Sequence, residues 1–218
     1  MAHEYLLGVK PVGSSRTIAT RILRHEDMNG SNRLFGGRLM EWIDDAAGIA
    51  ARRHAGVAIT TVAVDKLEFR YPAFLDDIVT IEAWVTHVER TSMEVRVDCY
   101  VEDTATGERR MINHAYLTEV CIDENGRPTP VPYGLVANTD EEHEECAAAR
   151  KRAELRKMRR TQGISLAKDG VRVIAWRGTG FGMNFVSPYV IPHATDVSHR
   201  PKYGLQLRAV TQTLSLWR

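Results

Sequence analysis

The sequence predicts an α+β fold in which one early helix is followed by an antiparallel β-sheet. Apolar residues recur at helical spacing between Met40 and Ala51, as on a helix that packs one face against a core. Apolar and polar residues instead alternate over residues 79–85 and 93–101, which is typical of antiparallel strands with one buried face. Segments rich in turn residues separate these runs. The predicted order is a strand, the helix and then four strands.

The predicted sheet starts before the helix and continues after it. A first strand is expected within residues 15–23. In the extended segment 60–71 the apolar side chains change face, which predicts a β-bulge near Asp65 and Lys66. The last strand is expected over residues 109–122, because an Asn-Gly pair and repeated prolines follow it.

Three regions are predicted along the chain. Residues 1–135 form the core domain, and residues 136–162 form a charged helix that begins with a capping box of Thr139 and Glu142. Its acidic first half and basic second half suit the helix dipole, so we expect a solvated helix; contact of the basic half with a phosphate-bearing ligand is the alternative. Residues 163–218 form a tail without sustained periodicity, to which no fold is assigned.

The composition is that of a globular protein without a charge-based partner. The 218 residues, of which 44% are hydrophobic, are enough for a sizeable core. A formal net charge of +1 gives no argument for binding nucleic acid or an anionic membrane. No apolar run approaches the roughly 20 residues that span a bilayer. The three cysteines form no CxxC pair and no signal peptide is evident, so a cytoplasmic location is expected.

The predicted helix carries two adjacent aspartates with different surroundings. At 100° per residue, Asp44 lies about 40° from Met40 on the apolar stripe, whereas Asp45 lies about 140° away on the polar face. A carboxylate at the edge of a buried stripe must be hydrogen-bonded, open to a cleft or shifted in pKa. Asp44 is therefore a candidate catalytic residue, although a hydrogen bond to a neighbouring strand or subunit would also explain it. Asp45 is expected to be solvated.

The loop before the helix supplies groups that complete such a site. Gly36 and Gly37 stand where the helix should begin, so their N–H groups lack helical acceptors and a ligand can approach the backbone closely. The amide of Asn29 can position an oxygen or a water, although "MNGSN" is equally explained as a turn. A base, backbone donors and an amide are the parts needed for acyl transfer to water. The absence of a GxSxG motif disfavours a serine hydrolase.

Three separated blocks resemble the hotdog-fold acyl-CoA thioesterases, the bacterial acyl-CoA hydrolase family. They are "NGSNRLFGGRLMEWIDDAAGIAARRH", "TTVAVDKLEF" and "RTSMEVRVDCYVE", within a resemblance that spans residues 15–160. The resemblance implies a hotdog fold, in which a curled antiparallel sheet wraps a long central helix. It also implies hydrolysis of acyl-CoA to a carboxylic acid and CoA, by a homodimer that in many relatives assembles into a homohexamer of three dimers.

The same resemblance implies roles for the residues considered above. Asp44 matches the catalytic acid of the family, as general base or nucleophile, and Gly37 matches the backbone donor to the oxyanion, with Gly36 beside it. Asn29 matches a loop asparagine that reaches the site from the other subunit. Because a thiolate is a good leaving group, this chemistry requires neither a metal nor a redox cofactor.

A CoA site is also implied by the resemblance. Arg90, Thr91 and Ser92 occupy a turn that in similar proteins reaches the nucleotide phosphates, and one guanidinium with two hydroxyls suits a phosphate. A solvated hairpin turn would explain the same residues. Thr60 and Thr61 open the strand that in relatives runs beside the pantetheine arm, and both equally suit a strand as β-branched residues.

Two other functions are compatible with this fold. A hotdog dehydratase acting on acyl thioesters would be expected to carry a histidine in the loop before the helix, and "MNGSNRLFGG" contains none. A non-catalytic acyl-CoA-binding regulator would keep the region of Arg90 but tolerate loss of Asp44. Release of free thiol from acyl-CoA distinguishes a hydrolase from both.

Overall fold

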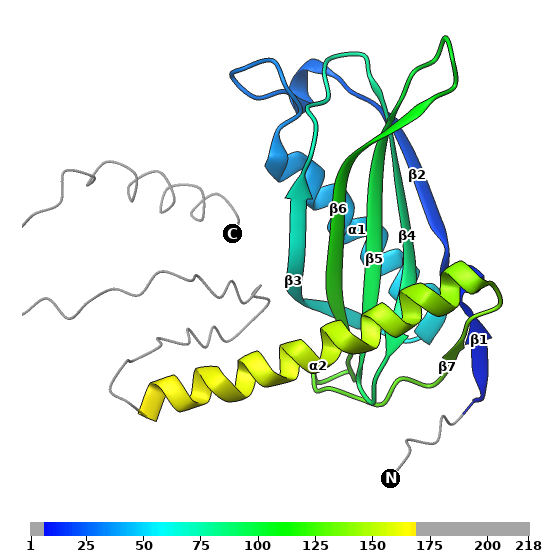
Figure 1. The fold of residues 1–218 in the computed structure, drawn as a ribbon, viewed down its shortest axis with the longest axis vertical. Coiled ribbons are helices and arrows are strands. Elements are labelled where there is room, and N and C mark those ends of the chain that lie inside the picture. Colours follow the sequence, from blue (N-terminus) through cyan, green and yellow to red (C-terminus); the bar gives the residue numbers. More distant parts are fainter. Residues whose placement is uncertain (1–6, 169–218) are drawn as a thin grey trace, which may run out of the picture. The chain divides into compact units, whose positions relative to one another are not determined.

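The computed structural model describes residues 7–168, with side chains as far as residue 159. A five-stranded antiparallel sheet has the strand order β2-β4-β5-β6-β3. Helix α1 lies on one face of this sheet and helix α2 crosses the other (Figure 1). The elements of the sheet and its helices are β2 Thr17–Ile22, α1 Gly36–Ala55, β3 Ile59–Phe69, β4 Ile78–Val88, β5 Ser92–Glu102, β6 Arg109–Cys121 and α2 Asp140–Lys168.

Short elements complete the described chain. Strand β1 (Val9–Pro11) pairs in parallel with β7 (Gly134–Val136), and two 3-10 turns cover Val12–Ser15 and His25–Asp27. The predicted first strand is confirmed but starts at Thr17, because Ser15 ends a 3-10 turn. No helix among residues 7–168 is long and apolar enough to cross a membrane.

Helix α1 buries a face of small residues against the sheet. Ile43, Ala47, Ala50 and Ala51 are all fully or almost fully buried, which confirms the predicted stripe. Alanine side chains are short, so the helix axis lies close to the strands. The helix ends at Gly56, whose φ of 72° is left-handed and whose N–H donates to the carbonyl of Arg52, an arrangement that favours glycine.

Strand β3 contains the predicted bulge and one more. Its register against β6 shifts between Val64 and Lys66, which confirms the bulge expected near Asp65. A second shift lies between Thr61 and Ala63 and was not predicted. Thr61 is thereby left opposite Glu119 of β6, just before the strand changes face.

Helix α2 is not the solvated helix that its charge pattern suggests. Ala149 and Ala153 are buried against the outer face of the sheet, and Arg152 and Arg156 both bind Glu94 of β5, whose side chain is fully buried. The expectation of solvation is therefore wrong for this face of α2, because a fully buried carboxylate requires cationic partners. If these two arginines bound a phosphate instead, they would have to release Glu94.

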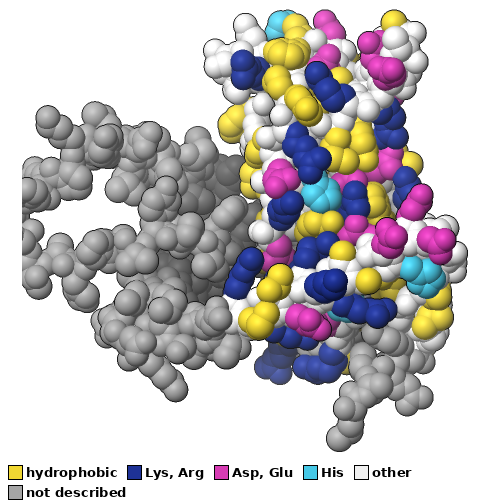
Figure 2. All heavy atoms as spheres, in the orientation of Figure 1, with side chains coloured by type: hydrophobic (Ala, Val, Ile, Leu, Met, Phe, Trp, Pro, Cys, Tyr) yellow, Lys and Arg dark blue, Asp and Glu magenta, His cyan; other side chains and the backbone are white. Residues whose placement is uncertain are grey.

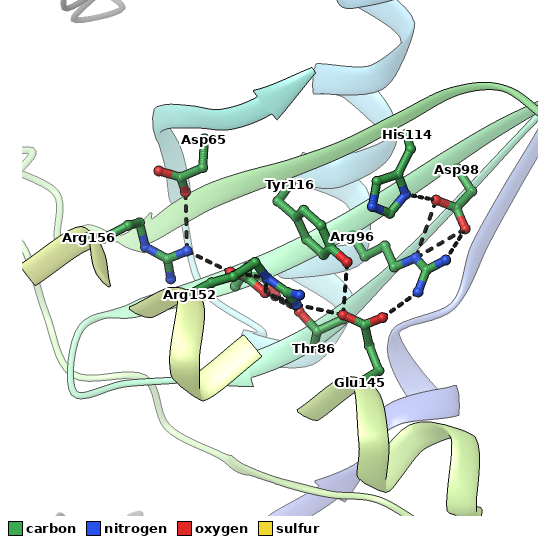
Figure 3. A network of polar contacts seen from close by, with 10 residues as sticks. Asp65, Thr86, Arg96, Asp98, His114, Tyr116, Glu145, Arg152 and Arg156 are labelled. Carbon is green, nitrogen blue, oxygen red and sulfur yellow. Dashed lines mark hydrogen bonds and ion pairs between the residues drawn. The ribbon is translucent and has the colours of Figure 1, made fainter. Parts of the chain in front are cut away.

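The polar residues of the sheet's outer face continue this network (Figure 3). Asp98 accepts hydrogen bonds from Arg96 and His114, and Arg96 also binds Glu145 of α2. Burial opposes ionisation of Asp98, but these donors outweigh it and hold the pKa of Asp98 below its ordinary value. Acidic and basic side chains are interspersed over this face (Figure 2). The alternation of apolar and polar residues predicts a sheet with one buried and one solvent-exposed face, whereas α2 covers part of the polar face.

The structure covers only part of the three regions that the sequence predicts. Helix α2 continues to Lys168, past the end expected at residue 162. Of the predicted tail, 163–218, the residues after Lys168 lie outside the described residues. The boundaries at residues 135 and 162 remain predictions.

Replacing both Arg152 and Arg156 by methionine should destabilise the protein strongly. The change leaves Glu94 buried without its two cations, which is expected to cost roughly 3 kcal/mol of unfolding free energy, measured by urea denaturation. The matched control replaces the exposed Arg150 and Lys151 of the same helix by methionine and should cost less than about 1 kcal/mol. Equal losses in the two double variants would show that the pairing with Glu94 does not hold α2 to the sheet.

Candidate active site

The two adjacent aspartates of α1 occupy different environments, as the helical phase predicts. Asp44 is half-buried at the border of the apolar face, next to the fully buried Ile43, whereas Asp45 is exposed. The packing of α1 against the sheet brings the Asp44 carboxylate to the start of β3.

One hydroxyl group lies between two carboxyl groups at this point. Thr61 Oγ1 lies 2.7 Å from Asp44 Oδ1, and the same atom lies 3.0 and 3.2 Å from the two oxygens of Glu119. Asp44 thus has the hydrogen bond to a neighbouring strand that was one of the two explanations for its position. The bond occupies one carboxylate oxygen and leaves the other for different partners.

Glu119 is a residue that the sequence interpretation missed. Its side chain is fully buried, and this burial raises the pKa of Glu119 to about 7; the hydrogen bond from Thr61 opposes the rise, and the negative charge of Asp44 adds to it. A signal was present in "YLTEVC", because Glu119 shares a strand face with Leu117 and Cys121, both buried. The argument applied to Asp44, an acid on an apolar face, would also have found Glu119.

The start of α1 has the open backbone donors that two glycines predict. No side chain in the described part of the chain caps the helix, and its first i→i−4 hydrogen bond runs from Leu39 N–H to the carbonyl of Phe35. The N–H groups of Gly36 and Gly37 precede this bond and so lack helical acceptors. A Cβ atom on Gly37 would lie 2.6 Å from the Phe35 ring, and one on Gly36 would lie 3.3 Å from the ring of Phe69. A side chain at position 37 would therefore require the exposed Phe35 ring to shift.

Asn29 closes a turn in the loop before the helix. Its Oδ1 accepts hydrogen bonds from the N–H groups of Ser31, at 2.9 Å, and Arg33, at 3.2 Å. The turn explanation thus accounts for the oxygen of the side chain. Its Nδ2 has no acceptor among residues 7–159, and no hydrogen bond joins Asn29 to Asp44 within the chain.

The residues assigned to CoA gather at one end of the sheet. Thr60 of β3 and Ser92 of β5 both pair with Val120 of β6, and the β4–β5 turn holds Arg90 and Thr91 beside them. Arg90 is exposed, whereas Thr91 and Ser92 are half-buried. The structure therefore brings Thr60, Arg90, Thr91 and Ser92 to the same end of the sheet as Asp44, Thr61 and Glu119. Thr60 and Ser92 nevertheless lie on the opposite face from Thr61 and Glu119, because successive residues of a strand alternate between faces.

Comparison with known proteins identifies the class to which this fold and site belong. The profile of the thioesterase superfamily matches residues 31–108. An acyl-CoA thioester hydrolase of Bacillus subtilis, described as uncharacterised, is 40% identical over 153 residues, which cover 70% of this chain and 88% of that protein.

Solved structures agree with the sequence matches. An acyl-CoA hydrolase of Staphylococcus aureus, solved with butyryl-CoA, CoA and CoA disulfide, has a TM-score of 0.69 and 31% identity over 75% of this chain and 99% of its own. A hexameric acyl-CoA thioesterase has a TM-score of 0.67 and 39% identity over 70% of this chain and 97% of its own. The fold is that of the hotdog thioesterases. Within them, the chain belongs to the acyl-CoA thioester hydrolase family, as the sequence blocks predict.

Replacing Glu119 by glutamine should stabilise the protein increasingly as the pH rises. Between the ordinary glutamate pKa of 4.5 and its folded value of about 7, the folded chain binds more protons than the unfolded chain, so the wild type loses stability with rising pH. Glutamine does not titrate. The difference in unfolding free energy between Glu119→Gln and wild type should therefore shift in favour of the variant by roughly 2–3 kcal/mol from about pH 5 to pH 8.

Urea denaturation at several pH values measures this difference. The same substitution at Glu124, which lies in an exposed turn, serves as the control and should give a difference that stays constant with pH. A pH-independent difference for Glu119→Gln would contradict the assigned effect of burial.

Proposed function

We propose that the chain hydrolyses acyl-CoA thioesters to a carboxylic acid and CoA, with Asp44 as general base or nucleophile. The observation that carries this proposal is the carboxylate of Asp44, set at the edge of an apolar helix face and held by Thr61, in a member of the acyl-CoA thioester hydrolase family. Such a carboxylate is oriented and partly shielded from water, as a catalytic base needs to be.

The proposed reaction is the attack of water on the thioester carbonyl. Asp44 takes a proton from the water as the oxygen bonds to the carbonyl carbon. The resulting oxyanion binds the N–H of Gly37 at the start of α1 in the other protomer, because Gly37 of the same chain lies two helical turns, about 10 Å, from Asp44. Asn29 orients the water or the thioester through its free amide hydrogens. The C–S bond then breaks and CoA leaves as a thiolate. This sequence of steps needs no metal and no redox cofactor.

Variants studied in a relative support this choice of residues. The Staphylococcus aureus acyl-CoA hydrolase has been solved with an asparagine, an aspartate or a threonine replaced by alanine. The three positions are separated by 15 and 17 residues, the same spacing as Asn29, Asp44 and Thr61 in this chain.

CoA is proposed to bind at the end of the sheet formed by Thr60 and the β4–β5 turn. The guanidinium of Arg90 is exposed and has no acidic partner among residues 7–159, so it is available to a phosphate. The hydroxyls of Thr91 and Ser92 add donors beside it. Thr60, at the start of β3, would lie beside the path of the pantetheine arm toward Asp44. Gly36 lies against Phe69 at the other end of β3, so its backbone would reach this path only from the other protomer.

The proposed active form is a homodimer built through β3 and α1. Strand β3 is an edge of the sheet, and exposed edges normally need a partner or a cover. Exposed apolar side chains accompany it: Val64 and Phe69 on β3, Ile49 on α1 and Phe35 before it are between 39% and 56% exposed. Pairing here would bring Asn29 of one protomer to Asp44 of the other. Hexamers of three such dimers would follow the hexameric relatives.

The substitution Asp44→Asn should abolish most turnover, whereas Asp45→Asn should be mild. Asparagine keeps the shape of Asp44 but removes the base, so kcat should fall by roughly 10²- to 10⁴-fold while acyl-CoA binding is retained. Asp45 is exposed and is the matched control. Steady-state thiol release measures kcat. A dead Asp45→Asn enzyme beside an active Asp44→Asn enzyme would reverse the assignment, and thioester binding without hydrolysis by wild type would indicate a regulator.

Mixing two inactive variants tests whether each site is shared between subunits. Coexpressed Asn29→Ala and Asp44→Asn protomers should regain about half the sites in each heterodimer, because one of its two sites then contains both intact residues. Differently tagged protomers allow the heterodimers to be purified and assayed for thiol release. Activity no higher than that of the single variants would place both residues in one subunit's site, and a monomer by light scattering would exclude the shared site.

A further inference from the structure

If Asp44 and Glu119 are both ionised, the single hydroxyl of Thr61 cannot donate a hydrogen bond to each of them. A threonine hydroxyl carries a single hydrogen and two lone pairs. Thr61 Oγ1 nevertheless lies within hydrogen-bond distance of both carboxyl groups, at 2.7 Å from Asp44 and 3.0 Å from Glu119. With both acids ionised, one carboxylate would face a lone pair of Thr61 instead of a hydrogen. A proton on one acid removes this conflict.

The surroundings of Glu119 decide which acid carries the proton. The charged group that faces Glu119 from α1 is Asp44, which is itself acidic. The neighbouring strands contribute Thr61 from β3 and Met93 from β5, and Cys121 shares its face of β6. No basic side chain within residues 7–159 forms an ion pair with Glu119. Glu119 is also fully buried, whereas Asp44 is only half-buried, so the proton belongs on Glu119.

The other buried glutamates of the sheet show the contrast. Glu82 and Glu94 lie on the outer face and each binds two arginines: Arg16 and Arg109 for the former, Arg152 and Arg156 for the latter. Those acids meet cations. Glu119, on the inner face, meets a hydroxyl and a second acid.

We propose that Glu119 is a positioning residue that keeps its proton during turnover, donating it to Thr61 Oγ1, while Thr61 in turn donates its own hydrogen to Asp44 Oδ1. The inference rests on the proposed role of Asp44 in hydrolysis. The chain of two hydrogen bonds fixes the direction of the Thr61 hydroxyl. It therefore holds one oxygen of Asp44 and leaves Oδ2 to face water.

Loss of the Glu119 proton should weaken catalysis. Two carboxylates would then compete for the single hydrogen of Thr61, and Asp44 would lose its fixed orientation. A second buried negative charge would also oppose the oxyanion that forms on the substrate. Because burial raises the pKa of Glu119 to about 7, kcat should fall as the pH rises through this value, by roughly tenfold for one lost hydrogen bond.

The first test detects the proton without measuring activity. Infrared difference spectra of the full-length wild type should show the C=O band of a protonated carboxylic acid that disappears with a midpoint near pH 7. The band should be absent in Glu119→Gln. It should be retained in Glu82→Gln, because the Glu82 carboxylate of the wild type is held ionised by two arginines and contributes no such band. Asp44→Asn should lower the midpoint, because it removes a negative neighbour, and Thr61→Val should raise it, because it removes a hydrogen bond to the charged form.

The second test separates positioning from a purely structural role. The kcat for butyryl-CoA is followed from about pH 6 to pH 8, with samples quenched and their thiol measured at one fixed pH. Wild type and Thr61→Ser, which keeps the hydroxyl, should show the fall near pH 7. Glu119→Gln should not, although its kcat at any one pH differs from that of wild type.

The outcomes distinguish failure of this inference from failure of the proposed function. Absence of the titrating band in wild type, or an unchanged fall of kcat in Glu119→Gln, overturns the role of Glu119 even if Asp44→Asn is inactive. A titrating band together with a fully active Asp44→Asn enzyme leaves the proton on Glu119 and refutes the catalytic role of Asp44.

Discussion

The close approach of α1 to the sheet is the constraint on which the site depends. The buried face of the helix is made largely of alanines, so the backbone of α1 comes near enough for a short aspartate to reach a hydroxyl of β3. Larger residues at Ala47 or Ala50 would push the helix outward and lengthen the 2.7 Å contact between Thr61 and Asp44. The same approach places the second acid, Glu119, against Thr61 from the next strand. Packing of apolar residues therefore determines the spacing of the polar ones.

The buried acids on the two faces of the sheet have different kinds of partner. On the outer face, Glu94 and Asp98 are compensated by arginines and a histidine, and this compensation attaches α2 to the sheet. On the inner face, Glu119 has no cationic partner among residues 7–159 and instead shares one hydroxyl with Asp44. A salt-bridged acid stays charged over a wide pH range, whereas an acid raised to a pKa of about 7 changes its charge under physiological conditions. Only the inner arrangement is suited to a site whose chemistry moves protons.

Much of the fold could be predicted from local patterns, because these patterns report which face of an element is buried. The alanine stripe of α1, the alternation in β4 and β5 and the bulge near Asp65 all follow from the spacing of apolar residues. The different environments of Asp44 and Asp45 follow from the same rule. The coverage of the outer face by α2 could not be predicted in this way, because an arginine that binds a buried glutamate 58 residues away looks like a solvated charge in the sequence. The second bulge after Thr61 left no change in the apolar pattern.

The candidate site divides into a part within one chain and a part that needs a second chain. Asp44, Thr61 and Glu119 are brought together by contacts between α1, β3 and β6 alone, so their arrangement is determined when a single protomer folds. Asn29 lies in the loop before α1, and the open N–H groups lie at the start of the helix itself. The side-chain oxygen of Asn29 already closes a turn within this loop, so only its amide hydrogens remain for a partner. A base that is oriented before assembly, with oxygen-binding groups supplied by dimerisation, would confine hydrolysis to the assembled protein. The exposed apolar edge of β3 and α1 would then link the stability of the dimer to the completeness of its site.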